Sequence, residues 1–169
     1  GHSERVTAWG LVMMAQFRGD TTAALRWLDV ASPVDADPAE VLEPAGPWPL
    51  PEGWRRAFHR GAVLLAANNH DTDAEAEREL RRAERASPQP ESANNLGVAL
   101  ARLGREVEAR AALATALRRS PDYLDASMNL FSAVPSHVTS HPLRREPSRS
   151  EYSIDAQAPG QSNPDARAA

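Results

Sequence analysis

The chain has 169 residues and a formal net charge of −4, and it contains neither cysteine nor lysine. These absences exclude disulfide scaffolds, cysteine nucleophiles, zinc fingers, P-loops and lysine Schiff bases. Alanine occurs 31 times, whereas Ile154 is the only isoleucine, so the composition favours helices over strands. No run of about 18 apolar residues occurs, which predicts that no segment of this sequence spans a membrane.

Apolar residues at helical spacing, punctuated by glycine and proline, predict a series of helices. Residues 4–32 form two predicted helices that separate at Gly19, and further helices are expected over 54–68, 74–86, 91–103, 106–119 and 124–134. Six prolines within 33–53 predict an insertion, in which Asp37-Pro38 favours one short helix at 38–43. From residue 135 onward the apolar content is low, which predicts either a disordered terminus or a tail held only by docking.

The helix pair over 90–121 carries the most specific pattern. It reads Asn-Leu-Gly at 95–97, Leu-Gly-Arg at 103–105, Glu-Ala at 108–109, Ala-Leu at 116–117 and a closing Pro121. This pattern resembles the tetratricopeptide repeat (TPR) family. Gly97 and Ala109 are expected where the paired helices approach closely, and Gly104 is expected to end the first helix in a left-handed conformation.

The resemblance implies a right-handed α-solenoid of about three helix hairpins plus a capping helix. Its units would be 5–33, 54–88 and 90–121, with the capping helix at 122–134 and the proline-rich insertion at 33–53. Residues 1–3 are typical of a vector-derived remnant, so the helical domain would span 4–134 and the extended or disordered tail 135–169. A signal peptide or anchor could precede this sequence, which leaves a bacterial cytoplasmic or periplasmic location open.

In TPR proteins the first helices of successive units line a concave groove that binds a partner segment. The resemblance places these residues in such a groove: Trp9, Met13, Gln16, Arg56, His59, Arg60, Val63, Asn94, Asn95, Val98, Arg102 and Asn129. Asn95 and Asn129 occupy matching places where family members often hold a peptide backbone, although capping or hydrogen bonding within a repeat is an equal alternative. The lysines of the chaperone-tail clamp are missing, and arginine does not replace lysine in such a site.

A polar cluster at His70, Asp71, Asp73 and Glu75 has alternating carboxylates, as calcium loops do. It lacks the glycine and the terminal glutamate that such loops require. We therefore expect one residue of this segment to cap a helix that starts at 74. The candidates are Asp71, Thr72 and Asp73.

Other candidate chemistry is weaker. His59, His137 and His141 have no serine or acidic partner at a diagnostic spacing. The arginines at 55, 56, 60, 78, 81, 82 and 85 alternate with glutamates, which favours a solvated helix face with ion pairs over nucleic-acid binding. The segment 141–152 is either a docking motif, for a partner or for self-association, or part of a disordered terminus.

The sequence therefore predicts a non-enzymatic adaptor that binds a protein segment and has no metal or cofactor. Two alternatives remain: a structural assembly or biogenesis component of a bacterial envelope machine, and the regulatory repeat domain of a longer enzyme.

Overall fold

The computed structural model describes residues 2–32 and 52–140. They form seven helices and no strand: α1 (His2–Phe17), α2 (Thr21–Ala31), α3 (Glu52–Ala66), α4 (His70–Ala86), α5 (Pro90–Arg102), α6 (Glu106–Arg119) and α7 (Leu124–Phe131). The all-α prediction is confirmed for this part of the chain. The expected helix at 38–43 and the expected docking motif at 141–152 lie outside the described residues.

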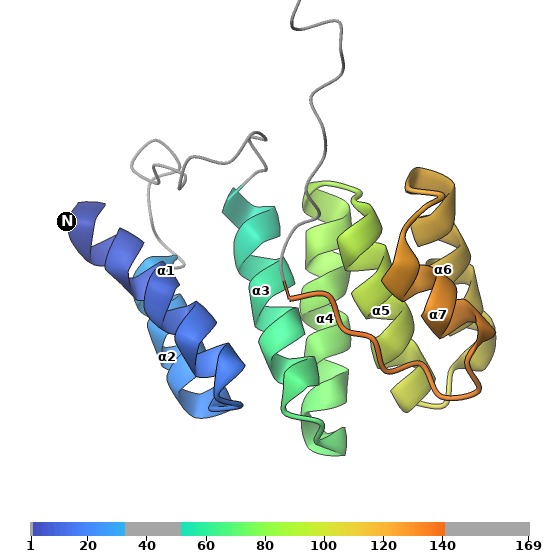
Figure 1. The fold of residues 1–169 in the computed structure, drawn as a ribbon, viewed down its shortest axis with the longest axis horizontal. Helices are drawn as coiled ribbons and strands as arrows, with labels where there is room; N and C mark the ends of the chain where they lie inside the picture. The colour runs from blue at the N-terminus through green and yellow to red at the C-terminus, as the bar shows by residue number, and fades with distance from the viewer. Residues whose placement is uncertain (1, 33–51, 141–169) are drawn as a thin grey trace, which may run out of the picture.

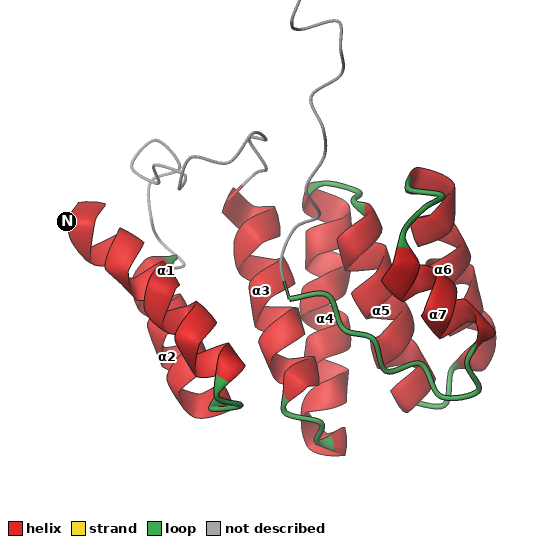
Figure 2. Cartoon of the chain, viewed as in Figure 1, coloured by secondary structure: helices red, strands yellow, loops and turns green. Residues whose placement is uncertain are grey.

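The helices pack mainly against their neighbours in the chain. α1 with α2, α3 with α4, and α5 with α6 form three hairpins, and α7 packs on α6 (Figure 1). α5 also contacts α3 and α7 directly, so these three helices lie side by side, and α1 lies on the same side of the molecule in Figure 1. Figure 2 shows that short loops join the helices within each hairpin. None of the described helices combines the length and the apolar character needed to cross a bilayer.

Two glycines make the tight turns within hairpins possible. Gly19 and Gly104 have φ angles of +71° and +76°, a left-handed conformation that residues with a Cβ rarely adopt. At the second turn the Arg105 amide donates to the carbonyl of Leu100 at 2.9 Å, which closes the end of α5. The left-handed conformation predicted for Gly104 is therefore confirmed.

Two other glycines allow helices within a hairpin to approach closely. A Cβ on Gly61 of α3 would lie 2.6 Å from Leu80 Cγ of α4, and a Cβ on Gly97 of α5 would lie 2.6 Å from Leu113 Cγ of α6. Both leucines are buried, so neither can move aside into solvent. The close approach predicted at Gly97 is confirmed.

A stacked aromatic pair on α3 contacts α5. The rings of Trp54 and Phe58 are parallel with centroids 4.6 Å apart, and both side chains are fully buried. Trp54 Nε1 donates to Ser92 Oγ of α5 at 3.4 Å. This cluster fixes the spacing between the second and third hairpins, and it underlies the face on which the odd-numbered helices lie.

The predicted start of α4 is wrong. The helix begins at His70, and its N-cap is Asn69, whose side chain accepts a hydrogen bond from the Asp71 amide at 3.0 Å. Asp73 is instead 3% exposed and lies 3.5 Å from Arg102 of α5. The cap predictions are therefore wrong: Asn69 is the cap, and Asp73 instead pairs with Arg102 at the helix interface. The residues that the sequence favoured as caps were Asp71, Thr72 and Asp73.

The predicted end of α7 is also wrong. The helix stops at Phe131, not at 134. Ser132 Oγ accepts a hydrogen bond from the Val134 amide at 3.1 Å and donates to its carbonyl at 2.9 Å, which turns the chain ahead of Pro135. A residue that precedes proline disfavours helical geometry, so the helix has ended before this point.

Candidate functional site

The segment after α7 crosses the face formed by the odd-numbered helices. Residues 132–140, called the strap below, leave α7 and pass back over α5 in an extended path (Figure 1). The sequence left two alternatives open for the tail, a disordered terminus and a docked segment. Residues 136–139 are docked. The contacts that hold them come largely from three asparagines that the sequence placed in a groove.

Asn129 of α7 holds the first part of the strap. Its Oδ1 accepts hydrogen bonds from the main-chain amides of Ser136 at 3.0 Å and His137 at 2.9 Å. Its Nδ2 donates to the His137 carbonyl at 2.9 Å and to Asn94 Oδ1 at 2.8 Å. Asn129 is 1% exposed, so its amide is fully used inside the protein.

Asn95 of α5 pairs with the main chain of one strap residue. Thr139 donates its amide hydrogen to Asn95 Oδ1 at 2.8 Å, and Asn95 Nδ2 donates to the Thr139 carbonyl at 2.8 Å. In this arrangement one side-chain amide forms both a donor and an acceptor bond with the main chain of one residue in an extended segment. Asn94, the neighbouring residue, donates to the His137 carbonyl at 3.0 Å and completes the row.

The Thr139 side chain enters a polar site that the sequence analysis did not select. Its hydroxyl donates to Asp125 Oδ2 at 3.0 Å, lies 3.3 Å from Asn94 Nδ2 and contacts the Tyr123 hydroxyl. Thr139 is only 6% exposed. Burial raises the pKa of Tyr123 above its ordinary value. Because the hydroxyl hydrogen of Thr139 is directed to Asp125, the hydrogen in the Tyr123–Thr139 contact is that of the phenol. No local spacing links residues 123, 125 and 139; only the fold brings them together.

Val138 supplies the apolar contact of the strap. It packs against the main hydrophobic cluster, which contains Trp54 and Phe58 of α3 and Val98 of α5. Val98, predicted to line a groove, is therefore buried in this cluster. Ser136 and Ser140 are exposed, so the inward-facing side chains of the strap are those of the adjacent residues Val138 and Thr139.

A second group of predicted groove residues lies between α1 and α3. The Trp9 ring meets the His59 ring edge-on with centroids 4.9 Å apart, and the Arg55 guanidinium lies 5.1 Å from the Trp9 ring. His59 is buried, whereas Met13 is 44% exposed and Gln16 is partly buried. Val63 is buried against Ala15 and Ala24 and forms part of the packing between the first two hairpins.

Most of the basic groups near this face have acidic partners. Arg56 pairs with Asp29 at 2.9 Å and Arg60 pairs with Glu75 at 2.8 Å. Arg102 donates to the Leu65 carbonyl at 2.7 Å and lies beside Asp73. These pairs bridge different helices: those of Arg56 and Arg102 connect neighbouring hairpins, and the Arg60–Glu75 pair joins the two helices of the second hairpin. Because carboxylates partly neutralise these arginines, the face lacks the strongly positive charge that is typical of nucleic-acid-binding surfaces.

The predicted polar cluster after α3 does not converge. His70 Nδ1 lies 3.8 Å from Asp73 Oδ2, but Asp73 also faces Arg102. Within residues 2–32 and 52–140 no group of three histidine or acidic side chains is arranged to hold a metal ion.

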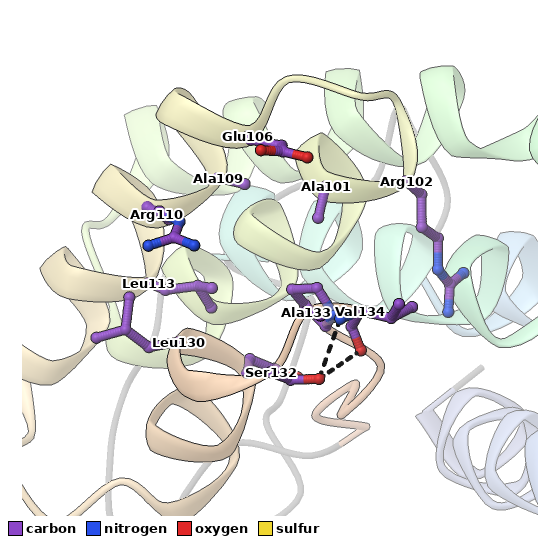
Figure 3. A pocket seen from close by; sticks show the side chains of 12 residues that line it. Ala101, Arg102, Glu106, Ala109, Arg110, Leu113, Leu130, Ser132, Ala133 and Val134 are labelled. Atoms are coloured by element: carbon purple, nitrogen blue, oxygen red, sulfur yellow. Dashed lines mark hydrogen bonds between the residues drawn. The ribbon is translucent and has the colours of Figure 1, made fainter.

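A pocket of about 300 Å³ lies beside the start of the strap. Figure 3 shows its walls: Arg102 from the end of α5, Arg110 and Leu113 from α6, and Leu130 from α7, with Val134 at the turn. Asn129 also lines it. The turn that directs the strap across α5 therefore also forms one side of this pocket.

The comparisons with known proteins give no relative: no protein-family model matches the chain, and no curated protein matches it.

Proposed function

We propose that the protein is a TPR-type adaptor that binds an extended segment of a partner protein across its odd-numbered helices. The fold would be a right-handed α-solenoid of three hairpins capped by α7. The contact between glycine and leucine supports this proposal because it recurs in successive hairpins. Gly61 and Gly97 are 36 residues apart and Leu80 and Leu113 are 33 apart, close to the TPR period of about 34 residues.

One observation carries the binding proposal: the asparagines of this face bind extended main chain. Asn95 and Asn129, 34 residues apart on α5 and α7, each exchange donor and acceptor bonds with the strap backbone. Main-chain bonds depend on an extended conformation and little on sequence, so a partner segment of the same conformation can form them. The face therefore has the chemistry of a peptide-binding site, occupied here by residues of its own chain.

The region between α1 and α3 would extend this groove beyond the strap. Trp9 offers a half-buried aromatic surface beside Arg55, and Met13 is exposed on the same helix. Aromatic residues and arginine are the residues that most often anchor interfaces. A partner segment longer than the strap would cover both regions.

The test uses a full chain whose strap cannot dock. Val138→Gly combined with Thr139→Gly changes only strap residues and leaves every groove residue intact; this variant is called the released chain below. A peptide display library is screened against it, and the affinities of selected peptides are measured by fluorescence anisotropy. Adding Asn95→Ala is expected to weaken binding by about tenfold or more, because two bonds to main chain are lost.

The matched control is Arg78→Ala in the released chain. Arg78 is exposed on α4, away from the strap, and its loss is expected to leave affinity unchanged. Met13→Ala together with Asn95→Ala tests both regions of the groove, because Met13 is exposed on α1 and its loss should leave the fold intact. If the selected peptides bind the Asn95→Ala and Arg78→Ala chains with equal affinity, the groove is not the binding site.

A further inference from the structure

The site around Thr139 satisfies every hydrogen-bonding position of one hydroxyl group. A hydroxyl has one donor and two acceptor positions. Thr139 donates its hydroxyl hydrogen to Asp125 Oδ2 at 3.0 Å. Its acceptor positions face Asn94 Nδ2 at 3.3 Å and the phenol of Tyr123. The three groups come from α5, from α7 and from the residue before α7, and they converge on this one atom.

The site also rejects other side chains at this position. Valine has the shape of threonine but would leave the Tyr123 hydroxyl without its partner in a buried place, and such losses are expensive. A phosphorylated or acidic residue would place negative charge beside the Asp125 carboxylate, whose Oδ2 lies 3.0 Å from the Thr139 hydroxyl oxygen. The chemistry therefore selects an uncharged hydroxyl.

The residue before the hydroxyl is also constrained. Val138 packs against the main hydrophobic cluster, whereas Ser136 and Ser140 are exposed and His137 contributes main-chain bonds. A ligand of this site therefore needs an aliphatic residue followed by threonine, in an extended segment. The strap carries this pair within a few residues of α7, so it binds as an internal ligand at an effective concentration on the order of millimolar.

We infer that the α5–α7 part of the groove recognises an unmodified aliphatic–threonine pair in an extended partner segment, and that the strap competes with that partner as an internal ligand. The inference rests on the proposed function. It adds which partner sequences bind and how the strap regulates their binding. A partner must displace residues 136–139 to bind, and a segment without the hydroxyl cannot replace their contacts.

The experiment measures binding of labelled peptides with the sequence of residues 134–142 to full chains. The released chain is expected to bind the native peptide at least about tenfold more tightly than the wild-type chain does, because the competing strap is gone. A peptide with Thr139→Val should bind the released chain about tenfold or more weakly than the native peptide, and one phosphorylated on Thr139 should not bind detectably. Thr139→Ser keeps the hydroxyl and should lose much less affinity.

A groove variant shows whether the hydroxyl site causes the preference. Tyr123→Phe in the released chain removes one donor to the peptide hydroxyl, so the ratio of affinities for threonine and valine peptides should fall. Circular dichroism of each chain reports whether it remains helical. If the released chain does not fold, amide exchange of residues 136–139 is compared between full chains with Thr139→Val and Thr139→Ser. Faster exchange in the valine chain is expected, and equal exchange overturns the inference.

The possible results separate the two proposals. Equal binding of threonine and valine peptides, with Asn95 still required, overturns the hydroxyl inference and leaves the adaptor proposal standing. A folded released chain that binds neither the native peptide nor any library peptide overturns both. A wild-type chain that sediments as a dimer and becomes monomeric with Thr139→Val shows that the occupant is a second copy's strap, which also overturns the partner assignment.

Discussion

Gly97→Ala is the substitution whose effect the structure defines most clearly. The added Cβ would lie 2.6 Å from Leu113 Cγ, 2.7 Å from Leu113 Cδ2 and 3.2 Å from the Ala109 carbonyl oxygen. Carbon atoms pack at about 3.5–4.0 Å, so α5 and α6 would have to separate by about 1 Å or Leu113 would have to leave its rotamer. Leu113 is 1% exposed and has no solvent to enter.

The magnitude follows from two opposing effects. Overpacking a core costs about 1–3 kcal/mol, whereas replacing a helical glycine with alanine gains about 0.5–1 kcal/mol of conformational entropy and helix propensity. The free energy of unfolding should therefore fall by up to about 2.5 kcal/mol, and should not rise as it does where the new Cβ meets open space. Because α5 carries Asn94 and Asn95, a displaced helix would also loosen the strap.

Gly10→Ala is the matched control. Gly10 lies inside α1, and a Cβ there would meet no atom within 4 Å. The same change should stabilise the chain by about 0.5–1 kcal/mol at this position. Urea unfolding followed by circular dichroism measures both variants. If Gly97→Ala is as stable as Gly10→Ala, the close approach of α5 to α6 is refuted, and the glycine–leucine repeat loses its physical basis.

Three further predictions concern the strap, a helix cap and a surface pair. Asn129→Ala removes the bonds to two strap amides, so hydrogen exchange at residues 136 and 137 should accelerate by about tenfold or more while amides within α4 keep their rates. Asp20 caps α2 by accepting from the Ala23 amide at 2.9 Å, and Asp20→Ala should lower the free energy of unfolding by about 1 kcal/mol in urea titrations. The side-chain hydrogen bond from Arg105 lowers the pKa of Glu108, so this carboxylate contributes stability that is present above its unfolded pKa and lost as pH falls through its folded pKa. Arg105→Gln should raise the pKa of Glu108 in an NMR titration, and an unchanged value would show that the pair does not form in solution.

The helical framework could be predicted because its signals are local. Gly104 ends α5 for a reason contained in one residue, namely that glycine tolerates a positive φ. The N-caps and the ends of the helices were harder to predict from the sequence. Aspartate is a residue type that often caps helices, but Asp73 pairs with Arg102, 29 positions later. Asn69 is the cap instead.

The candidate site was predicted only in part. Matching positions in a repeat identified Asn95 and Asn129 as residues able to hold main chain, and the structure has them holding residues 136–139. Tyr123, Asp125 and Thr139 were not selected, because they form a site only after the strap folds back over α5. The sequence placed the arginines at 56 and 60 in the groove, whereas in the structure their side chains pair with Asp29 and Glu75 on neighbouring helices.

The sequence by itself determined that residues 2–32 and 52–140 are largely helical, and it located most helix boundaries to within a few residues. The signals that it used, namely alanine content, apolar spacing, glycine and proline, act on the backbone close to them in the chain. Only the tertiary structure decided what occupies the asparagine-lined face. The path of the strap depends on bonds such as that from Asn95 to Thr139, which join residues 44 positions apart. A buried amide must find a partner somewhere, but only the assembled fold shows that this partner is the protein's own main chain.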